Sequence, residues 1–194
     1  MSKKNKEGFE TRAIHAGQKA DPTTGAVMMP IYTSSTFEQE SPGVHKGFDY
    51  SRSINPTRKA FEECIASLEN GEVGFGFSSG VAAISACVEL LAPGDHVIAM
   101  NDLYGGTVRL FNEIKTLSQG IEVTYVDMTD IQNVLDANTD ITKMIFVETP
   151  TNPLLRVVDL SAIADFAKSE GILSVCDNTF ASPYVQQPLG HGID

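Results

Sequence analysis

From residue 73 onward the chain alternates short β-rich runs with helical runs, and this alternation limits the fold more than any other feature. Such alternation is typical of β-α-β units, in which right-handed helical crossovers join parallel strands. Strands are expected at 73–77, 96–100, 122–126, 144–147 and 172–176, and helices at 80–91, 105–117, 131–137 and 159–170. The sequence therefore predicts an α/β fold with a mostly parallel sheet flanked by helices.

One further helix is expected before the first of these strands. Asn55 is a good N-cap and Pro56 suits the first helical position, while Gly71 is expected to end the helix. Apolar residues recur between them at helical spacing.

Residues 1–50 show no sustained period and are rich in Gly, Pro, Ser and Thr. Their apolar residues, such as Ile31, Tyr32 and Phe37, are too numerous for plain disorder. We expect an ordered, extended arm over 1–50 that packs on a partner subunit, followed by an α/β domain over 51–194.

Charge argues against two classes of partner. The 194 residues carry a formal net charge of −11, whereas nucleic acids and anionic membranes attract clustered Lys and Arg. No apolar run approaches the roughly 20 residues of a membrane span. The lysines at positions 3, 4 and 6 are followed by charged residues, which argues against a signal peptide.

The cysteines indicate a compartment. Cys64, Cys87 and Cys176 are odd in number, far apart and set in apolar patterns, so we expect buried, reduced thiols. This usage favours a cytoplasmic protein.

The expected site lies after the strands, because ligands of parallel sheets bind outside the carboxyl ends of the strands. Ser79, Gly80 and Val81 follow the first expected strand and open a helix. Free N–H groups and small side chains there suit a phosphate, although an ordinary tight turn would look similar. Gly74, Gly76 and Gly80 also form a loose dinucleotide-binding pattern, which would need an acidic residue about 20 positions later. Asp95 stands there, but in an expected turn.

Two more expected strand ends carry polar or aromatic groups. Tyr104 stands beside two glycines and is able to lie flat over a planar ligand, or simply to act as a hydrophobic plug that caps the helix. Glu148 and Asn152 lie in a segment stiffened by two prolines, where Asn152 offers a polar amide. A rigid turn without a ligand has the same composition.

Charged groups complete the set of candidates. Asp177 follows the last expected strand, where a carboxylate is costly unless a positive group pairs with it. A pyridinium nitrogen is one such partner, and a structural N-cap is the alternative. Tyr50 and Arg52, before the first long helix, offer a phenol and a guanidinium to phosphate oxygens.

Together these segments resemble the cystathionine γ-synthase family of pyridoxal-phosphate (PLP) enzymes, from about residue 11 to residue 194. The matching segments occur in the family's order: Tyr50-Ser51-Arg52-Ser53-Ile54-Asn55-Pro56-Thr57, Tyr104-Gly105-Gly106-Thr107, Glu148-Thr149-Pro150-Thr151-Asn152-Pro153 and Asp177-Asn178-Thr179-Phe180. The resemblance implies the large domain of fold type I, as in aspartate aminotransferase, and PLP as the cofactor.

The resemblance also implies residue roles. Ser79, Gly80 and Val81 would hold the PLP phosphate, with Tyr50 and Arg52 reaching in from a neighbouring subunit of a homo-oligomer, expected to be a tetramer. Tyr104 would stack on the ring and move protons, with Tyr50 counted beside it among the catalytic residues. Asp177 would pair with the ring nitrogen, and Thr179 would lie beside the ring. Asn152 and Glu148 would bind the sulfur amino-acid substrate.

The implied activity is that of a carbon–sulfur lyase or transferase of methionine and cysteine metabolism. It would act at the γ-carbon of cystathionine or of an O-activated homoserine. The segments 104–107 and 154–159 look more like γ-synthases and γ-lyases than β-lyases, and Gly106 makes methionine γ-lyase less expected. Cystathionine β-lyase and O-acylhomoserine sulfhydrylase remain alternatives.

The lysine that the family bonds to PLP is expected after the aspartate, yet no lysine follows Lys168. The family's C-terminal domain is also missing from the sequence. We therefore expect the 194 residues alone to be inactive, as part of a longer enzyme or as a truncated, non-catalytic assembly module with the same fold.

Overall fold

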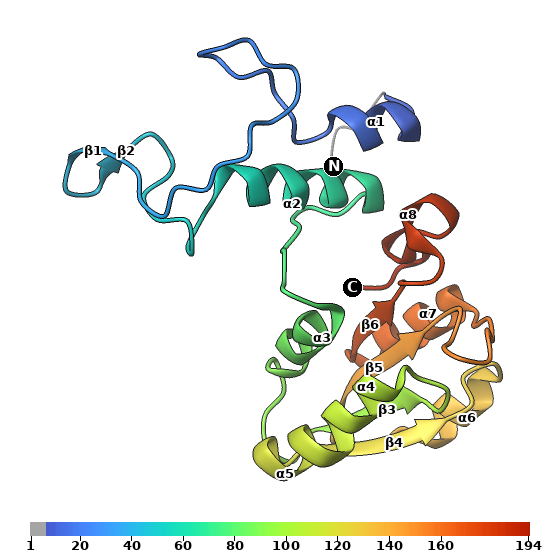
Figure 1. The fold of residues 1–194 in the computed structure, drawn as a ribbon. Coiled ribbons are helices and arrows are strands. Elements are labelled where there is room, and N and C mark those ends of the chain that lie inside the picture. The colour runs from blue at the N-terminus through green and yellow to red at the C-terminus, as the bar shows by residue number, and fades with distance from the viewer. Residues whose placement is uncertain (1–6) are drawn as a thin grey trace. The chain divides into compact units, whose positions relative to one another are not determined.

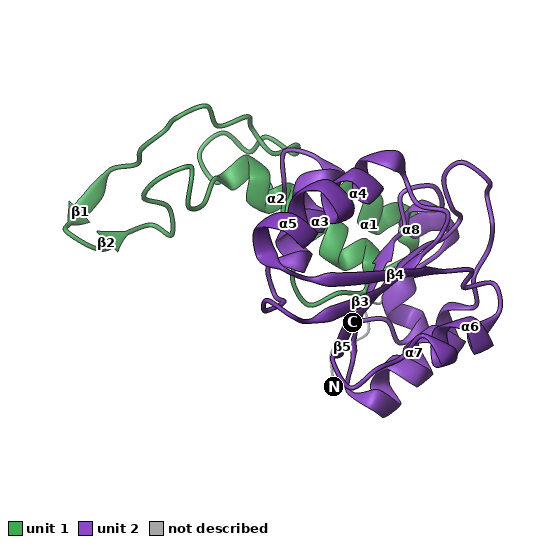
Figure 2. Ribbon diagram, turned by 90° about the horizontal axis from the view of Figure 1, so that it is seen from below, with its two compact units in different colours: residues 1–76 green, residues 77–194 purple. Residues whose placement is uncertain are grey.

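The computed structural model describes residues 7–194, so the lysines that argued against a signal peptide lie outside it. The chain divides into two compact units, Met1–Gly76 and Phe77–Asp194 (Figure 2). The long helix that follows the expected arm belongs with the arm in the first unit. The expected domain boundary at residue 50 remains a prediction.

The first unit is built around one long helix. Its elements are α1 (Phe9–His15), β1 (Gln39–Ser41), β2 (Val44–His45) and α2 (Pro56–Glu69). β1 and β2 pair as a small antiparallel ribbon. Helix α1 is tied to α2 by the buried Arg12, whose guanidinium donates to the Ser67 carbonyl and, at 3.3 Å, to Asn70 Oδ1.

The caps of α2 explain its length. Asn55 Oδ1 accepts the N–H groups of Thr57 at 2.8 Å and Arg58 at 3.4 Å, which confirms the expected start. The expected end at Gly71 is wrong by one residue. Asn70 takes the left-handed conformation, with φ 57°, because asparagine tolerates it better than most residues.

The second unit contains a parallel four-stranded sheet (Figure 1). Its strands are β3 (His96–Met100), β4 (Glu122–Val126), β5 (Thr142–Glu148) and β6 (Leu173–Asp177), in the order β4-β3-β5-β6. The first two match their expected ranges, while β5 is longer at both ends and β6 begins and ends one residue later. The predicted parallel α/β architecture is confirmed.

The expected strand at 73–77 is wrong. This segment is extended but pairs with no strand among residues 7–194. The period-two alternation of Val73, Phe75 and Phe77 with glycines indicates an extended backbone, whereas a strand also requires a hydrogen-bonded neighbour. The side chains of Val73, Phe75 and Phe77 are all exposed.

Helices cover both faces of the sheet. Figure 2 shows α3, α4 and α5 on one face and α6 and α7 on the other. Their ranges are α3 (Gly80–Val88), α4 (Gly105–Arg109), α5 (Thr116–Gln119), α6 (Ile131–Asp136) and α7 (Leu160–Glu170), and α8 (Ser182–Val185) and the 3-10 turn η2 (Pro188–His191) follow. The helix expected at 105–117 is one helical stretch in which a π-helical segment, η1 (Leu110–Lys115), joins α4 to α5.

The core lies between these layers. Val97, Ile98 and Met100 of β3 and Ile145 and Phe146 of β5 are fully buried. A parallel strand covered on both faces reads as a continuous apolar run, which is why β3 was recognisable from sequence. The three cysteines are half-buried. No helix among the described residues is long and apolar enough to cross a membrane.

Candidate active site

Glu148 lies at the centre of the predicted site, at the end of β5. Its side chain is 5% exposed, and each of its oxygens accepts one backbone hydrogen bond. Oε2 accepts the N–H of Tyr104 at 2.9 Å, and Oε1 accepts the N–H of Asn152 at 2.8 Å. The carboxylate therefore joins the loops that follow β3 and β5.

The pKa of the Glu148 carboxyl lies above its usual range. Burial raises it most, because a charged carboxylate loses hydration there. The N–H groups of Tyr104 and Asn152 act in the opposite direction, and the negative charges of Asp177 and Asp102 raise the pKa further. Glu148 is thus a carboxylate that protonates more readily than an ordinary glutamate.

Asp102 makes a second tie between the same two loops. It is buried, and its Oδ2 accepts both the Thr151 hydroxyl and, at 3.2 Å, the N–H of Leu154. Neither Asp102 nor Thr151 was expected from sequence to matter. The available signal was a carboxylate two residues after the buried strand β3, similar to the signal that drew attention to Asp177.

Asp177 ends β6 and stands beside Glu148 in strand register. Its Oδ1 accepts the N–H of Thr179 at 3.0 Å and also the Thr179 hydroxyl. Its Oδ2 accepts no hydrogen bond from any residue in the described part of the chain. The half-buried carboxylate is thus oriented by Thr179 and keeps one oxygen for another donor.

Tyr104 directly precedes α4 and is 45% exposed. Its ring edge lies against Gly106, where a side chain would collide with it. An exposed aromatic face whose backbone is fixed by Glu148 is suited to stacking on a planar ligand. The alternative, a hydrophobic plug that caps the helix, stays a prediction.

Asn152 lies in a tightly bent loop. The peptide bonds Thr149-Pro150 and Asn152-Pro153 are both cis. The Asn152 side chain is half-buried and makes no hydrogen bond to residues 7–194. Its amide is available to a polar ligand.

Ser79, Gly80 and Val81 form the start of α3. Ser79 Oγ accepts the N–H of Ala82 at 3.1 Å, so this serine is the N-cap of the helix. The N–H groups of Gly80 and Val81 meet no acceptor in the described residues. Apart from the chain neighbours and the backbone of the helix itself, no atom of the described residues lies within 4 Å of the position that a Cβ on Gly80 would occupy, so a ligand has close access to the backbone.

Tyr50 and Arg52 belong to the first unit, whereas the other predicted site residues belong to the second. The Arg52 guanidinium donates to the Tyr50 hydroxyl and lies 5.0 Å from the centre of its ring. The two side chains therefore form one cationic, hydrogen-bonding group, and its role in binding phosphate stays a prediction.

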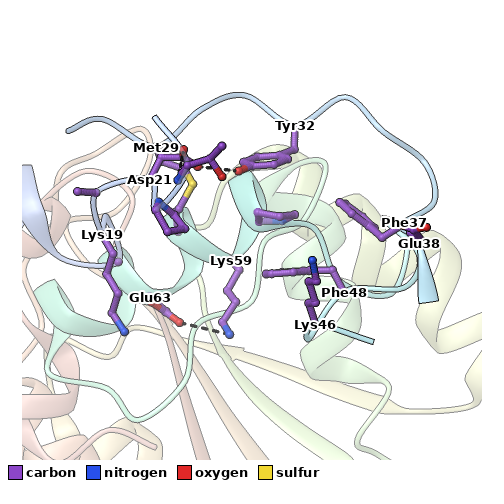
Figure 3. A pocket seen from close by; sticks show the side chains of 16 residues that line it. Lys19, Asp21, Met29, Tyr32, Phe37, Glu38, Lys46, Phe48, Lys59 and Glu63 are labelled. Carbon is purple, nitrogen blue, oxygen red and sulfur yellow. Dashed lines mark hydrogen bonds and ion pairs between the residues drawn. The ribbon is translucent and has the colours of Figure 1, made fainter. Parts of the chain in front are cut away.

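The first unit also has a cavity of about 540 Å³ between the arm and α2 (Figure 3). Its wall contains a hydrogen bond of 3.3 Å from the Tyr32 hydroxyl to Asp21 and an ion pair of 3.8 Å between Lys59 and Glu63. None of the predicted site residues lines it.

The residues present fit PLP. Asp177 offers an open carboxylate oxygen to a positively charged ring nitrogen, and the free N–H groups of Gly80 and Val81 suit a phosphate. Tyr104 supplies an exposed aromatic face.

Comparison with known proteins decides the family. Residues 10–194 match the family model described as Cys/Met metabolism PLP-dependent enzyme. The chain belongs to this family. Its members depend on PLP, which agrees with the fit of the site.

Relatives in the Cys/Met metabolism PLP-dependent enzyme family carry several activity names. A cystathionine beta-lyase of Coxiella burnetii is 56% identical over 97% of this chain and 49% of its own length. A cystathionine gamma-lyase of Dictyostelium discoideum is 49% identical over 100% of this chain and 50% of its own. A probable cystathionine gamma-synthase of Herpetosiphon aurantiacus also matches, so the preference for γ-acting members stays a prediction.

Solved structures agree on the fold. Cystathionine gamma-lyase from Lactobacillus plantarum, complexed with L-serine, superimposes with a TM-score of 0.93 at 50% identity. The match covers 97% of this chain and 49% of that one. The architecture is that of the fold type I large domain, and the chain spans about half the length of the relatives it matches.

Proposed function

We propose that the protein carrying this chain is a PLP-dependent trans-sulfuration enzyme that acts at the γ-carbon of cystathionine or of an O-activated homoserine. The main support is Asp177, whose Oδ1 is held by Thr179 while Oδ2 stays open at the carboxyl edge of the sheet. A carboxylate in this state is suited to keep a proton on a ring nitrogen.

The phosphate would be held by two groups of residues. The N–H groups of Gly80 and Val81, in the helix start that Ser79 caps, would bind its oxygens. The paired Tyr50 and Arg52 side chains would add a phenol and a guanidinium from a neighbouring subunit. We therefore also propose a homo-oligomer with shared sites, expected to be a tetramer. The three free cysteines, Cys64, Cys87 and Cys176, favour a cytoplasmic location for the protein.

Bound PLP supplies a ring that accepts the electron pair left at the substrate Cα when a proton departs. The chain's own residues would set up that step. Asp177 would hold the proton on the ring nitrogen, and Thr179 would fix the carboxylate in place. Tyr104 would stack on the ring and move protons through its hydroxyl, and Asn152 would bind the substrate carboxylate.

Product analysis tests the proposal and separates its variants. The purified protein is incubated with PLP and cystathionine, and the 2-oxo acid and thiol are identified by mass spectrometry. Cleavage at the γ-carbon gives cysteine, 2-oxobutyrate and ammonia, whereas cleavage at the β-carbon gives homocysteine, pyruvate and ammonia. O-Activated homoserine offered with cysteine or sulfide tests for a synthase or a sulfhydrylase.

A non-catalytic assembly module is the competing function from another class. It would keep the fold and subunit contacts yet turn over none of these substrates at any PLP concentration. That outcome would overturn the enzymatic proposal, while pyruvate as the only 2-oxo acid would move it to a β-lyase.

A further inference from the structure

We infer that Glu148 is a positioning residue that holds Tyr104 and Asn152 in place, rather than a ligand for the substrate. The inference deepens the proposed function and rests on it where turnover is concerned. The hydrogen-bond geometry itself does not depend on which substrate is used.

Glu148 is buried and both of its oxygens already accept hydrogen bonds, so it is poorly placed to bind a ligand. Its side chain is 5% exposed, and both oxygens already accept backbone N–H groups at 2.9 and 2.8 Å. A substrate could bind this carboxylate only by displacing one of these bonds. That would leave a partly buried N–H without an acceptor, which is unfavourable because the group has also lost its hydration.

The two N–H groups belong to the residues that the proposed chemistry requires to be placed accurately. Tyr104 caps α4 without a side-chain hydrogen bond of its own, so Glu148 fixes the entry of the chain into that helix. Pro153 directly follows Asn152 and has no N–H group to donate, while the N–H of Thr151, before it, donates to the Arg156 carbonyl at 3.0 Å. The bond to Glu148 therefore anchors Asn152 to the end of β5.

Asp102 provides a matched contrast. It ties the same two loops, but both of its hydrogen bonds end on one oxygen, Oδ2. An asparagine keeps one carbonyl oxygen and so retains both bonds. At Glu148 the bonds are divided between two oxygens, so a glutamine keeps one and turns an NH₂ group toward the other N–H.

Charge makes the arrangement sensitive to acid. The charged groups that act on Glu148 are Asp102, in the loop after β3, and Asp177, at the end of β6. Both are negative, and burial adds to their effect in raising the pKa of Glu148. Protonation places an O–H opposite one of the two N–H groups, so one loop is released as the pH falls.

The test follows the backbone amide resonances of Tyr104 and Asn152 against pH by TROSY NMR, in the native protein, Glu148→Gln and Asp102→Asn. In the native protein both resonances should shift together through one transition. In Glu148→Gln this transition should vanish. In Asp102→Asn it should persist and move to lower pH, because a like charge has been removed from Glu148.

Native amides that do not titrate together would overturn the inference, and that measurement needs no variant to fold. A transition unchanged by Glu148→Gln would overturn it as well. Steady-state kinetics give a second readout. Glu148→Gln should raise KM because Asn152 is displaced, and lower kcat because Tyr104 is displaced. The combined loss in kcat/KM should be about tenfold or more. Absence of turnover in the native protein would refute the proposed function, while the amide titration would still decide the role of Glu148.

Discussion

A methyl group on Gly106 would lie 2.4 Å from Cε1 of the Tyr104 ring. The ring can rest against the first turn of α4 only because position 106 has no side chain. Apart from its two chain neighbours and the backbone of its own helix, the same methyl group on Gly105 would approach nothing closer than the end of Arg109, at 4.0 Å. Two neighbouring glycines therefore differ sharply in what they permit.

Gly106→Ala should move the Tyr104 ring and lower kcat/KM by roughly 10- to 100-fold, because a stacking ring displaced by an ångström no longer fits its partner. Gly105→Ala is the matched control and should leave kcat/KM unchanged while slightly stabilising the helix. Steady-state kinetics and thermal unfolding measure both effects. Equal kinetics for the two variants would refute a role for Gly106.

Asp177→Asn should lower kcat by about 100-fold or more, because a neutral amide cannot hold a proton on the ring nitrogen. The fold should survive, since an asparagine Oδ1 still accepts both Thr179 donors. Far-UV circular dichroism and the melting temperature check the fold beside the kinetics. Near-normal turnover would make Asp177 a structural residue.

Arg52→Ala should raise the dissociation constant of PLP by about 10- to 100-fold, the effect of one or two lost charge-assisted hydrogen bonds. Excess PLP should restore kcat, because phosphate contacts act equally in ground and transition states. Arg52→Lys keeps the charge and should fall between the two. Full PLP occupancy with low kcat in Arg52→Ala would contradict the assignment to phosphate.

His96 should make the second unit less stable in mild acid. Its buried ring lies 2.8 Å from the Thr142 hydroxyl through Nδ1 and 2.9 Å from the Thr124 hydroxyl through Nε2. Burial lowers the pKa of His96, although Glu122 acts against this. Its contribution is therefore present above the unfolded pKa of about 6.5 and is lost as the pH falls through that range.

Urea unfolding between pH 8 and pH 5 measures this effect. The free energy of unfolding should fall with pH in the native protein and fall less in His96→Gln. Replacing the exposed His15 in the same way should leave the slope as it is. A slope that His96→Gln does not alter would assign the acid sensitivity to another group.

Patterns confined to one element predicted the fold well. The buried strand β3 followed from a continuous apolar run, and the partly exposed strand β4 from a β-branched run between turn residues. Asp159 and Gly171 fixed the ends of α7. The failure at 73–77 has a physical reason. Pairing depends on a neighbouring strand, and no local pattern reports whether one exists.

The sequence predicted which strand ends carry the site residues, but not the hydrogen bonds that connect those residues. The sequence placed Glu148 and Asn152 in one loop. It could not reveal that the Glu148 carboxylate accepts the N–H groups of both Tyr104 and Asn152, which are 48 residues apart in the chain. The approach of the Tyr104 ring to Gly106 was equally hidden, since it depends on a side-chain rotamer.

The parallel order of the sheet has a consequence for biosynthesis. β3 leaves the ribosome before both of its neighbours, because β4 and β5 follow it in the chain. Until they are made, Val97, Ile98 and Met100 have no strand to cover them, and this nascent segment is an apolar target for chaperones. Slowing translation before β4 and β5 have left the ribosome should therefore increase chaperone binding to β3, whereas slowing it once both have left should not.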